Sequence, residues 1–290
     1  MENTVESRKS WRKALKHRLR ARRKTIKKIP TIPITDLDLS EIPHHFNLTH
    51  CLPTEFELSP RETEMVSPPA HLSSILPDYG IATSHSPPNK ALIRSRIDVI
   101  ILTVLAKVKR EFAAKPRSSI ASASSAASAS LESVHLQFAR EMKFVWKSGK
   151  QRVRLSGIVD YSLWYGKPND HANMVMVKMV TMDLLKFGVY QCLAYMAIIH
   201  ETRKQASIPD TSVYGVATDS SEWVFIRIRP NGEWVTKSYD WVHSPQEVVS
   251  MLAKTLALAA SFDPQTGQKR WCHWSEPEFP TSLEQPKSKR

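Results

Sequence analysis

The sequence predicts an α/β fold, in which helices flank a mixed central β-sheet. Three stretches repeat apolar residues at helical spacing, and several shorter runs are apolar or alternate apolar with polar residues, as strands do. Between Leu155 and Arg203 the order strand, turn, strand, helix joins the two patterns in one segment. Since such elements bury their apolar sides against one another, we expect a layered core that contains both types.

The predicted helices are residues 91–115, 188–204 and 244–260. The first repeats Ile and Val at helical spacing and ends before Pro116, which cannot continue a helix. The third opens with Ser-Pro-Gln-Glu, which supplies a capping serine, a proline at the first helical position and a glutamate three residues after the cap. We expect all three helices to pack on the sheet.

Short apolar or alternating runs predict the strands. A Ser-Gly-Lys turn joins the first two as a hairpin, and Pro-Asn-Gly joins the last two. One strand ends on the carboxylate of Asp160, and the next is apolar except for Lys178. The predicted strands are residues 134–146, 153–160, 174–180, 213–218, 223–229 and 233–237.

The positive charge of the chain is concentrated at its N-terminus. The 290 residues carry 41 Lys and Arg against 28 Asp and Glu, a net charge of +13, and the first 30 residues alone hold 12 Lys and Arg against two Glu. Clustered cations neutralise phosphates, so we expect this basic arm, residues 1–30, to supply most of any affinity for nucleic acid. Nuclear import fits the same arm, while a mitochondrial presequence and a solvated tail are the alternatives.

Composition divides the remaining chain into three parts. Residues 31–90 are rich in Pro, Ser and Thr and are predicted to be a disordered linker, residues 91–262 a folded domain, and residues 263–290 a polar tail. Three cysteines, far apart in sequence, indicate a reducing compartment rather than a disulfide framework. No apolar run is long enough for a membrane span, so we expect no membrane partner.

Two motifs carry a resemblance to a known family. Gly157-Ile158-Val159-Asp160-Tyr161, the apolar strand that follows, and Gln191-x-x-x-Tyr195 on the next helix resemble the PD-(D/E)xK nuclease-like superfamily, in particular its branch common in fungal genomes. The resemblance covers approximately residues 91–260. It implies a restriction-endonuclease-like sheet and a site formed by Asp160, Lys178, Gln191 and Tyr195, with Asp160 as the metal ligand.

The chain departs from the family's catalytic motif. Such nucleases use two carboxylates to hold magnesium, and a lysine that orients or activates the attacking water. Here the second strand reads Met-Val-Lys-Met-Val, so Lys178 takes the position of the second acid and Val180 that of the lysine. Val159 also replaces the proline of the motif. One carboxylate holds magnesium weakly, and an ammonium group beside it adds repulsion.

The sequence therefore favours a nuclease-like protein with impaired catalysis. It would act by binding nucleic acid, DNA in preference to RNA, through the basic arm, or by binding a protein partner. The alternative is an active magnesium-dependent endonuclease with a rearranged set of acids, for which Glu141 and Asp183 are the nearest candidates. A relic without selected activity is the third hypothesis. The arm favours the nucleus as location, with the mitochondrion as the alternative.

Overall fold

The computed structural model describes residues 29–52, 59–114, 134–148, 151–165, 175–179 and 185–261. The chain divides into two compact units. The larger unit comprises residues 38–141 and 158–290, and the smaller comprises residues 1–37 and 142–157. Each unit is treated in turn.

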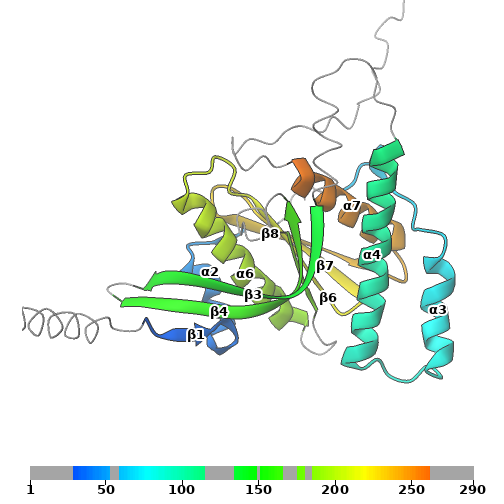
Figure 1. Ribbon diagram of the computed structural model, residues 1–290, viewed down its shortest axis with the longest axis horizontal. Coiled ribbons are helices and arrows are strands. Elements are labelled where there is room, and N and C mark those ends of the chain that lie inside the picture. Colours follow the sequence, from blue (N-terminus) through cyan, green and yellow to red (C-terminus); the bar gives the residue numbers. More distant parts are fainter. Residues whose placement is uncertain are drawn as a thin grey trace, which may run out of the picture. The chain divides into compact units, whose positions relative to one another are not determined.

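The larger unit is built on a mixed β-sheet (Figure 1). Its strands lie in the order β4-β5-β6-β7-β8-β2, and β3 pairs with β4. β6 lies parallel to β5, and β2 lies parallel to β8, whereas the other pairs in this order are antiparallel. The strands are β2 (Thr49–His50), β3 (Val134–Ser148), β4 (Gln151–Tyr165), β5 (Val175–Met179), β6 (Val213–Thr218), β7 (Glu222–Ile228) and β8 (Glu233–Asp240).

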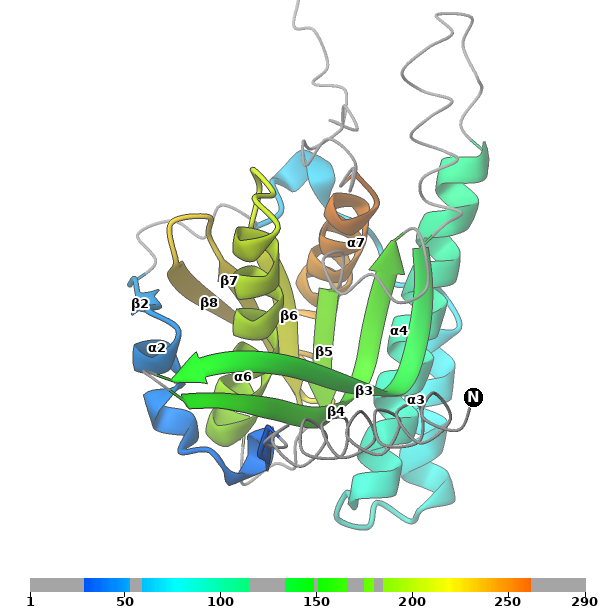
Figure 2. The ribbon, with the colours of Figure 1, turned by 60° about the vertical axis from the view of Figure 1, so that its left-hand side comes forward.

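Helices cover both faces of this sheet (Figures 1 and 2). α6 (Leu185–Gln205) packs on one face, against β5 and β6. α4 (Lys90–Ala114) and α7 (Pro245–Ser261) pack on the other face, and α3 (Leu72–Ala82) packs on α4. The main apolar core lies between α4, α7 and the sheet, where Trp223 and Phe225 are its largest fully buried side chains from β7. The predicted α/β fold with a mixed sheet and flanking helices is therefore confirmed.

Most predicted elements agree with the structure. The three predicted helices correspond to α4, α6 and α7, and the strand predicted at 213–218 is β6. The loop at 118–130, the turn at 166–173 and the tail at 263–290 lie outside the described residues. The restriction-endonuclease-like arrangement of the sheet stays a prediction.

The smaller unit is a short β-structure. β1 (Thr31–Pro33) lies parallel to β4 over Arg154–Ser156, and the backbone N–H of Arg154 donates to the Pro30 carbonyl at 2.7 Å. The 142–148 part of β3 and the 151–157 part of β4 complete it. After β1 comes the 3-10 helix η1 (Ile34–Asp36), where Ile34 is fully buried and so anchors the end of β1.

The segment predicted as a disordered linker, residues 31–90, contains ordered elements where it is described. Besides β1, β2, η1 and α3, it holds η2 (Leu39–Glu41), α2 (Ile42–His45) and η3 (Glu62–Glu64). Leu72 and Leu76 of α3 are buried in the main core, and Glu64 forms an ion pair with Lys254 of α7 at 2.7 Å. This corrects the expectation: a few apolar anchors at helical spacing fix the segment, although its average composition is that of a linker.

Replacing Leu72 by Ala tests this correction. Leu72 is only 2% exposed, so the substitution leaves a cavity and should lower the free energy of unfolding by about 2–5 kcal/mol. Urea unfolding of the full chain measures the change. Ile81→Ala on the same helix is the matched control, because Ile81 is 67% exposed and should change stability by less than about 0.5 kcal/mol. Equal, small effects of both substitutions would show that α3 does not pack in the core and that the segment behaves as a linker.

Candidate functional site

The candidate site lies on the face of the sheet that α6 covers. Its position depends on Gly215 of β6, where α6 approaches the sheet closely. A Cβ atom at Gly215 would lie 2.4 Å from the Met196 sulfur and 2.8 Å from the Cys192 sulfur, both on α6. No side chain fits there unless the side chains of Met196 and Cys192 move. Residues 213, 215 and 217 therefore face α6, because alternate residues of a strand share a face.

The strand register carries this face over to β5. Met176 of β5 lies beside Gly215, and Lys178 lies beside Ala217. Partners in a parallel pair share a face of the sheet, so positions 176 and 178 belong to the α6 face. The backbone of Lys178 is part of β5.

β4 is the antiparallel neighbour of β5. Tyr161 pairs with Val177 and Ser162 with Met176 in the antiparallel pair of β4 and β5. Continuing this register by one residue sets Asp160 opposite Lys178. Directly opposed residues in an antiparallel pair share a face and lie about 4.5–5.5 Å apart at Cβ. The sequence motif and the backbone register thus bring the two positions to the same place on the sheet.

Gln191 and Tyr195 come to this place from α6. They are four residues apart and so lie on one side of the helix. The Tyr195 hydroxyl donates to the Ile158 carbonyl of β4 at 2.9 Å, although the ring itself is buried, at 1% exposure. Burial, followed by the nearby charge of Asp160, raises the pKa of Tyr195 to about 12, and the hydrogen bond from Gln191 opposes this rise. Gln191, Tyr195 and Asp160 therefore form one cluster, as the resemblance implies.

This donor set does not fit a magnesium ion. The described residues contain no group of three or more His, Cys, Asp or Glu side chains that could hold a metal. The cluster pairs one carboxylate with a phenol and an amide, and its opposing position on β5 is a lysine. Magnesium prefers several hard oxygen ligands in octahedral geometry, with carboxylates among them. Of the two other acids considered, Glu141 is exposed and Asp183 lies outside the described residues.

The opposite face of the same strands is apolar, with one polar cluster. Tyr161 is fully buried there, and burial together with the Asp98 carboxylate of α4 raises its pKa. The Arg94 guanidinium lies 5.9 Å from the centre of the Tyr161 ring. The Tyr161 hydroxyl and Asp98 Oδ1 are both buried without a hydrogen bond to any described residue. The sequence pattern showed α4 only as an apolar core helix and did not reveal this cluster.

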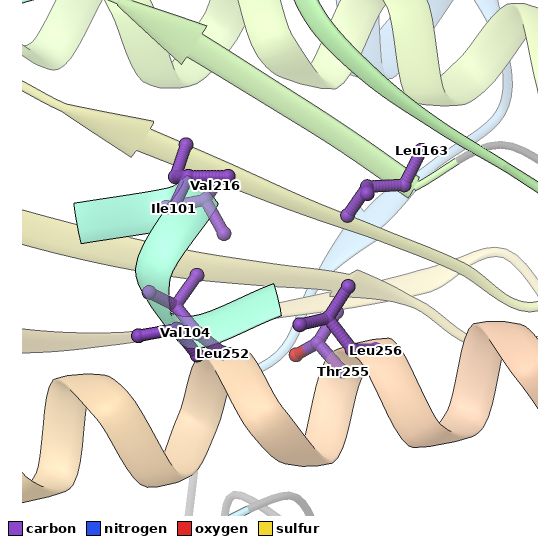
Figure 3. A pocket seen from close by; sticks show the side chains of 7 residues that line it. All are labelled: Ile101, Val104, Leu163, Val216, Leu252, Thr255 and Leu256. Atoms are coloured by element: carbon purple, nitrogen blue, oxygen red, sulfur yellow. The ribbon is translucent and has the colours of Figure 1, made fainter. Parts of the chain in front are cut away.

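A small pocket on this face is lined by apolar residues (Figure 3). It has room for about one water molecule, too little for a substrate. Its walls come from α4, α7, β4 and β6, and its only polar lining residue is Thr255, whose hydroxyl donates to the Met251 carbonyl at 2.7 Å. The pocket is therefore a packing defect of the core rather than a binding site.

Two further residues of α6 brace the start of β6. His200 is 2% exposed, and its Nδ1–H donates a hydrogen bond to the Thr211 carbonyl at 2.8 Å. Arg203 is also buried and donates to the Ser212 carbonyl. Burial lowers the pKa of His200, so the ring is held neutral. A sequence pattern on α6 does not reveal these contacts, because the partner carbonyls lie beyond the end of the helix.

The tryptophans of the sheet serve packing. Trp223 and Trp234 are buried, at 0% and 5% exposure, so both rings pack inside the fold. The side chains of Trp164 and Tyr165 lie outside the description. Stacking on nucleic-acid bases needs an exposed ring face, so neither Trp223 nor Trp234 can provide it.

Comparison with known proteins adds no relative. No protein-family model and no curated protein matches this sequence. Among the described helices, none has the length and apolarity needed to cross a membrane.

Tyr195→Phe tests the anchoring of α6 on β4. Loss of the hydrogen bond to Ile158 should lower the free energy of unfolding by about 1 kcal/mol at pH 8. The ordinary pKa of tyrosine is about 10, so the unfolded chain ionises before the folded one. The parent should therefore lose stability as pH rises from about 10 towards 12, by up to about 2 kcal/mol more than the variant. Urea unfolding across this range measures both effects, and parallel pH profiles would contradict the assignment.

Proposed function

We propose that the chain is a nuclease-like protein of the PD-(D/E)xK type with impaired catalysis, which acts by binding nucleic acid, DNA in preference to RNA, or a protein partner. The observation that supports this best is the convergence on one face of the sheet. The β4–β5 register sets Asp160 opposite Lys178, and α6 brings Gln191 and Tyr195 to the same carboxylate. These are the four positions that the sequence motif singled out.

The chemistry of this cluster favours binding over hydrolysis. Phosphodiester hydrolysis of this type needs paired carboxylates for the metal and a base for the water. The cluster offers one carboxylate, and the position of the second acid holds a lysine. In the proposed site the Lys178 ammonium balances the charge of Asp160, so the half-buried carboxylate needs no metal. Gln191 and Tyr195 then fix the helix to the strand.

The basic arm supports nucleic acid as the partner. Its charge makes the nucleus the proposed location, with the mitochondrion as the alternative. An active magnesium-dependent endonuclease would need acids from outside the described cluster, and the cleavage assay below distinguishes it.

A double-mutant cycle tests the charge balance between Asp160 and Lys178. Lys178→Ala should lower the free energy of unfolding by about 1–3 kcal/mol, because it removes the cation opposite a half-buried carboxylate. Asp160→Asn in the same chain should recover most of that loss. Urea unfolding gives the four free energies. Lys90→Ala is the control, since Lys90 is exposed and its loss should cost less than about 0.5 kcal/mol. Additive effects of the two substitutions would show that the positions do not interact.

Rebuilding the motif tests the impairment. Plasmid DNA incubated with the parent and magnesium or manganese should stay intact. The double substitution Lys178→Glu with Val180→Lys restores the acid and the lysine of the motif, and should create magnesium binding measurable by titration calorimetry, with weak cleavage. Adding Asp160→Asn to this variant is the control and should abolish both. Cleavage by the unmodified parent that is lost on Asp160→Asn would contradict the proposal in favour of the active endonuclease.

A further inference from the structure

The two compact units differ sharply in charge. The smaller unit, residues 1–37 and 142–157, contains 17 Lys and Arg against three Asp and Glu. The rest of the chain contains 24 Lys and Arg against 25 Asp and Glu. The entire net positive charge of the protein therefore belongs to the smaller unit. The N-terminal arm accounts for most of it, and the remainder lies in a folded segment far away in sequence.

That segment is the ribbon formed by β3 and β4 over residues 142–157, here called the basic ribbon. Its sequence holds five Lys and Arg and no Asp or Glu. The side chains alternate between two faces, as strand geometry requires. One face is apolar and buried: Met142 and Phe144 from β3, Val153 and Leu155 from β4. The other face exposes Lys143, Val145, Arg152 and Arg154.

The two arginines are held by their strand and not by side-chain partners. Arg152 and Arg154 are separated by one residue and so project from the same face of β4. Both are exposed, and neither side chain forms a hydrogen bond or ion pair with another described residue. The ribbon sequence itself contains no carboxylate that could pair with them. Two guanidinium groups are thus presented on a rigid element for an external anion.

The strand β1 connects the basic arm to this face. Thr31 is the register partner of Arg154, and the Pro30 carbonyl accepts the Arg154 N–H. Register partners in a parallel pair share a face, and Thr31 is exposed as Arg154 is. The chain that precedes Thr31 is the arm, with 12 Lys and Arg between residues 8 and 28. The end of the arm is therefore fixed beside the arginines of the ribbon.

We propose that the exposed face of the basic ribbon is a surface that binds the phosphate backbone of duplex DNA. The proposal rests on nucleic acid as the partner under the proposed function, and it assigns the contact to folded residues outside the nuclease-like cluster. A two-stranded ribbon fits the major groove of B-form DNA, which is about 12 Å wide. Its cations would release counterions from the phosphates, and the absence of acids in its sequence removes repulsion.

The test is the salt dependence of DNA binding by the full chain. Fluorescence anisotropy with a labelled 20-base-pair duplex, as an arbitrary probe of about two helical turns, gives the dissociation constant at several salt concentrations. Arg152→Ala with Arg154→Ala should weaken binding by about tenfold or more at 0.1 M salt and lower the slope of log K against log salt by about two. Arg152→Lys with Arg154→Lys keeps both charges and should retain the parental slope.

The control removes the same charge elsewhere. Lys90 and Arg110 are exposed on α4, so Lys90→Ala with Arg110→Ala lowers the net charge equally and should leave the slope unchanged. Circular dichroism and urea midpoints check that all variants are folded. Equal slopes for the ribbon and control variants would overturn the ribbon assignment while leaving the proposed function intact.

Failure of the parent to bind DNA at all would overturn the proposed nucleic-acid partner as well. If polyglutamate binds with the ribbon dependence described above and DNA does not, the surface belongs to an acidic protein partner and the proposal is wrong.

Discussion

The close contact between α6 and β6 at Gly215 is the constraint on which the candidate site depends. The sulfur atoms of Met196 and Cys192 occupy the space that a side chain at position 215 would take. At this distance the helix can reach over the neighbouring strands, and Tyr195 can donate to the Ile158 carbonyl of β4. A side chain at position 215 would have to displace these sulfur atoms. The absence of a side chain on β6 thus allows the close approach of the helix that carries Gln191 and Tyr195.

The two faces of the sheet perform different tasks as a result. The face under α4 and α7 holds the main cluster of buried aromatic and aliphatic side chains, whose apolar burial stabilises the fold. The α6 face carries the cluster of Asp160, Gln191 and Tyr195, at the place where α6 packs against β4. Because strands alternate their side chains, the same segment of β4 serves both tasks through adjacent residues: Tyr161 enters the core and Asp160 enters the site.

The net positive charge of the protein does not lie in the unit that holds this site. The cluster of Asp160, Gln191 and Tyr195 lies in the larger unit, whose Lys and Arg nearly equal its Asp and Glu, whereas the smaller unit holds the net positive charge. Long-range attraction of a polyanion depends on net charge and therefore acts on the smaller unit. Under the proposed function, binding and chemistry therefore fall to different residues, and a lysine at position 178 need not reduce the affinity for a polyanion.

The sequence by itself determined the elements whose information is local. Apolar spacing predicted α4, α6 and α7, and the motif singled out Asp160, Lys178, Gln191 and Tyr195 before any geometry was known. Only the tertiary structure decided the features that depend on contacts between residues far apart in the sequence. The segment 31–90 has the composition of a linker, yet Leu72 and Leu76 within it are buried in the core that α4, α7 and the sheet form. Arg152 and Arg154 are unremarkable in sequence, because only the alternation of an exposed strand and its pairing with β1 align them with the arm.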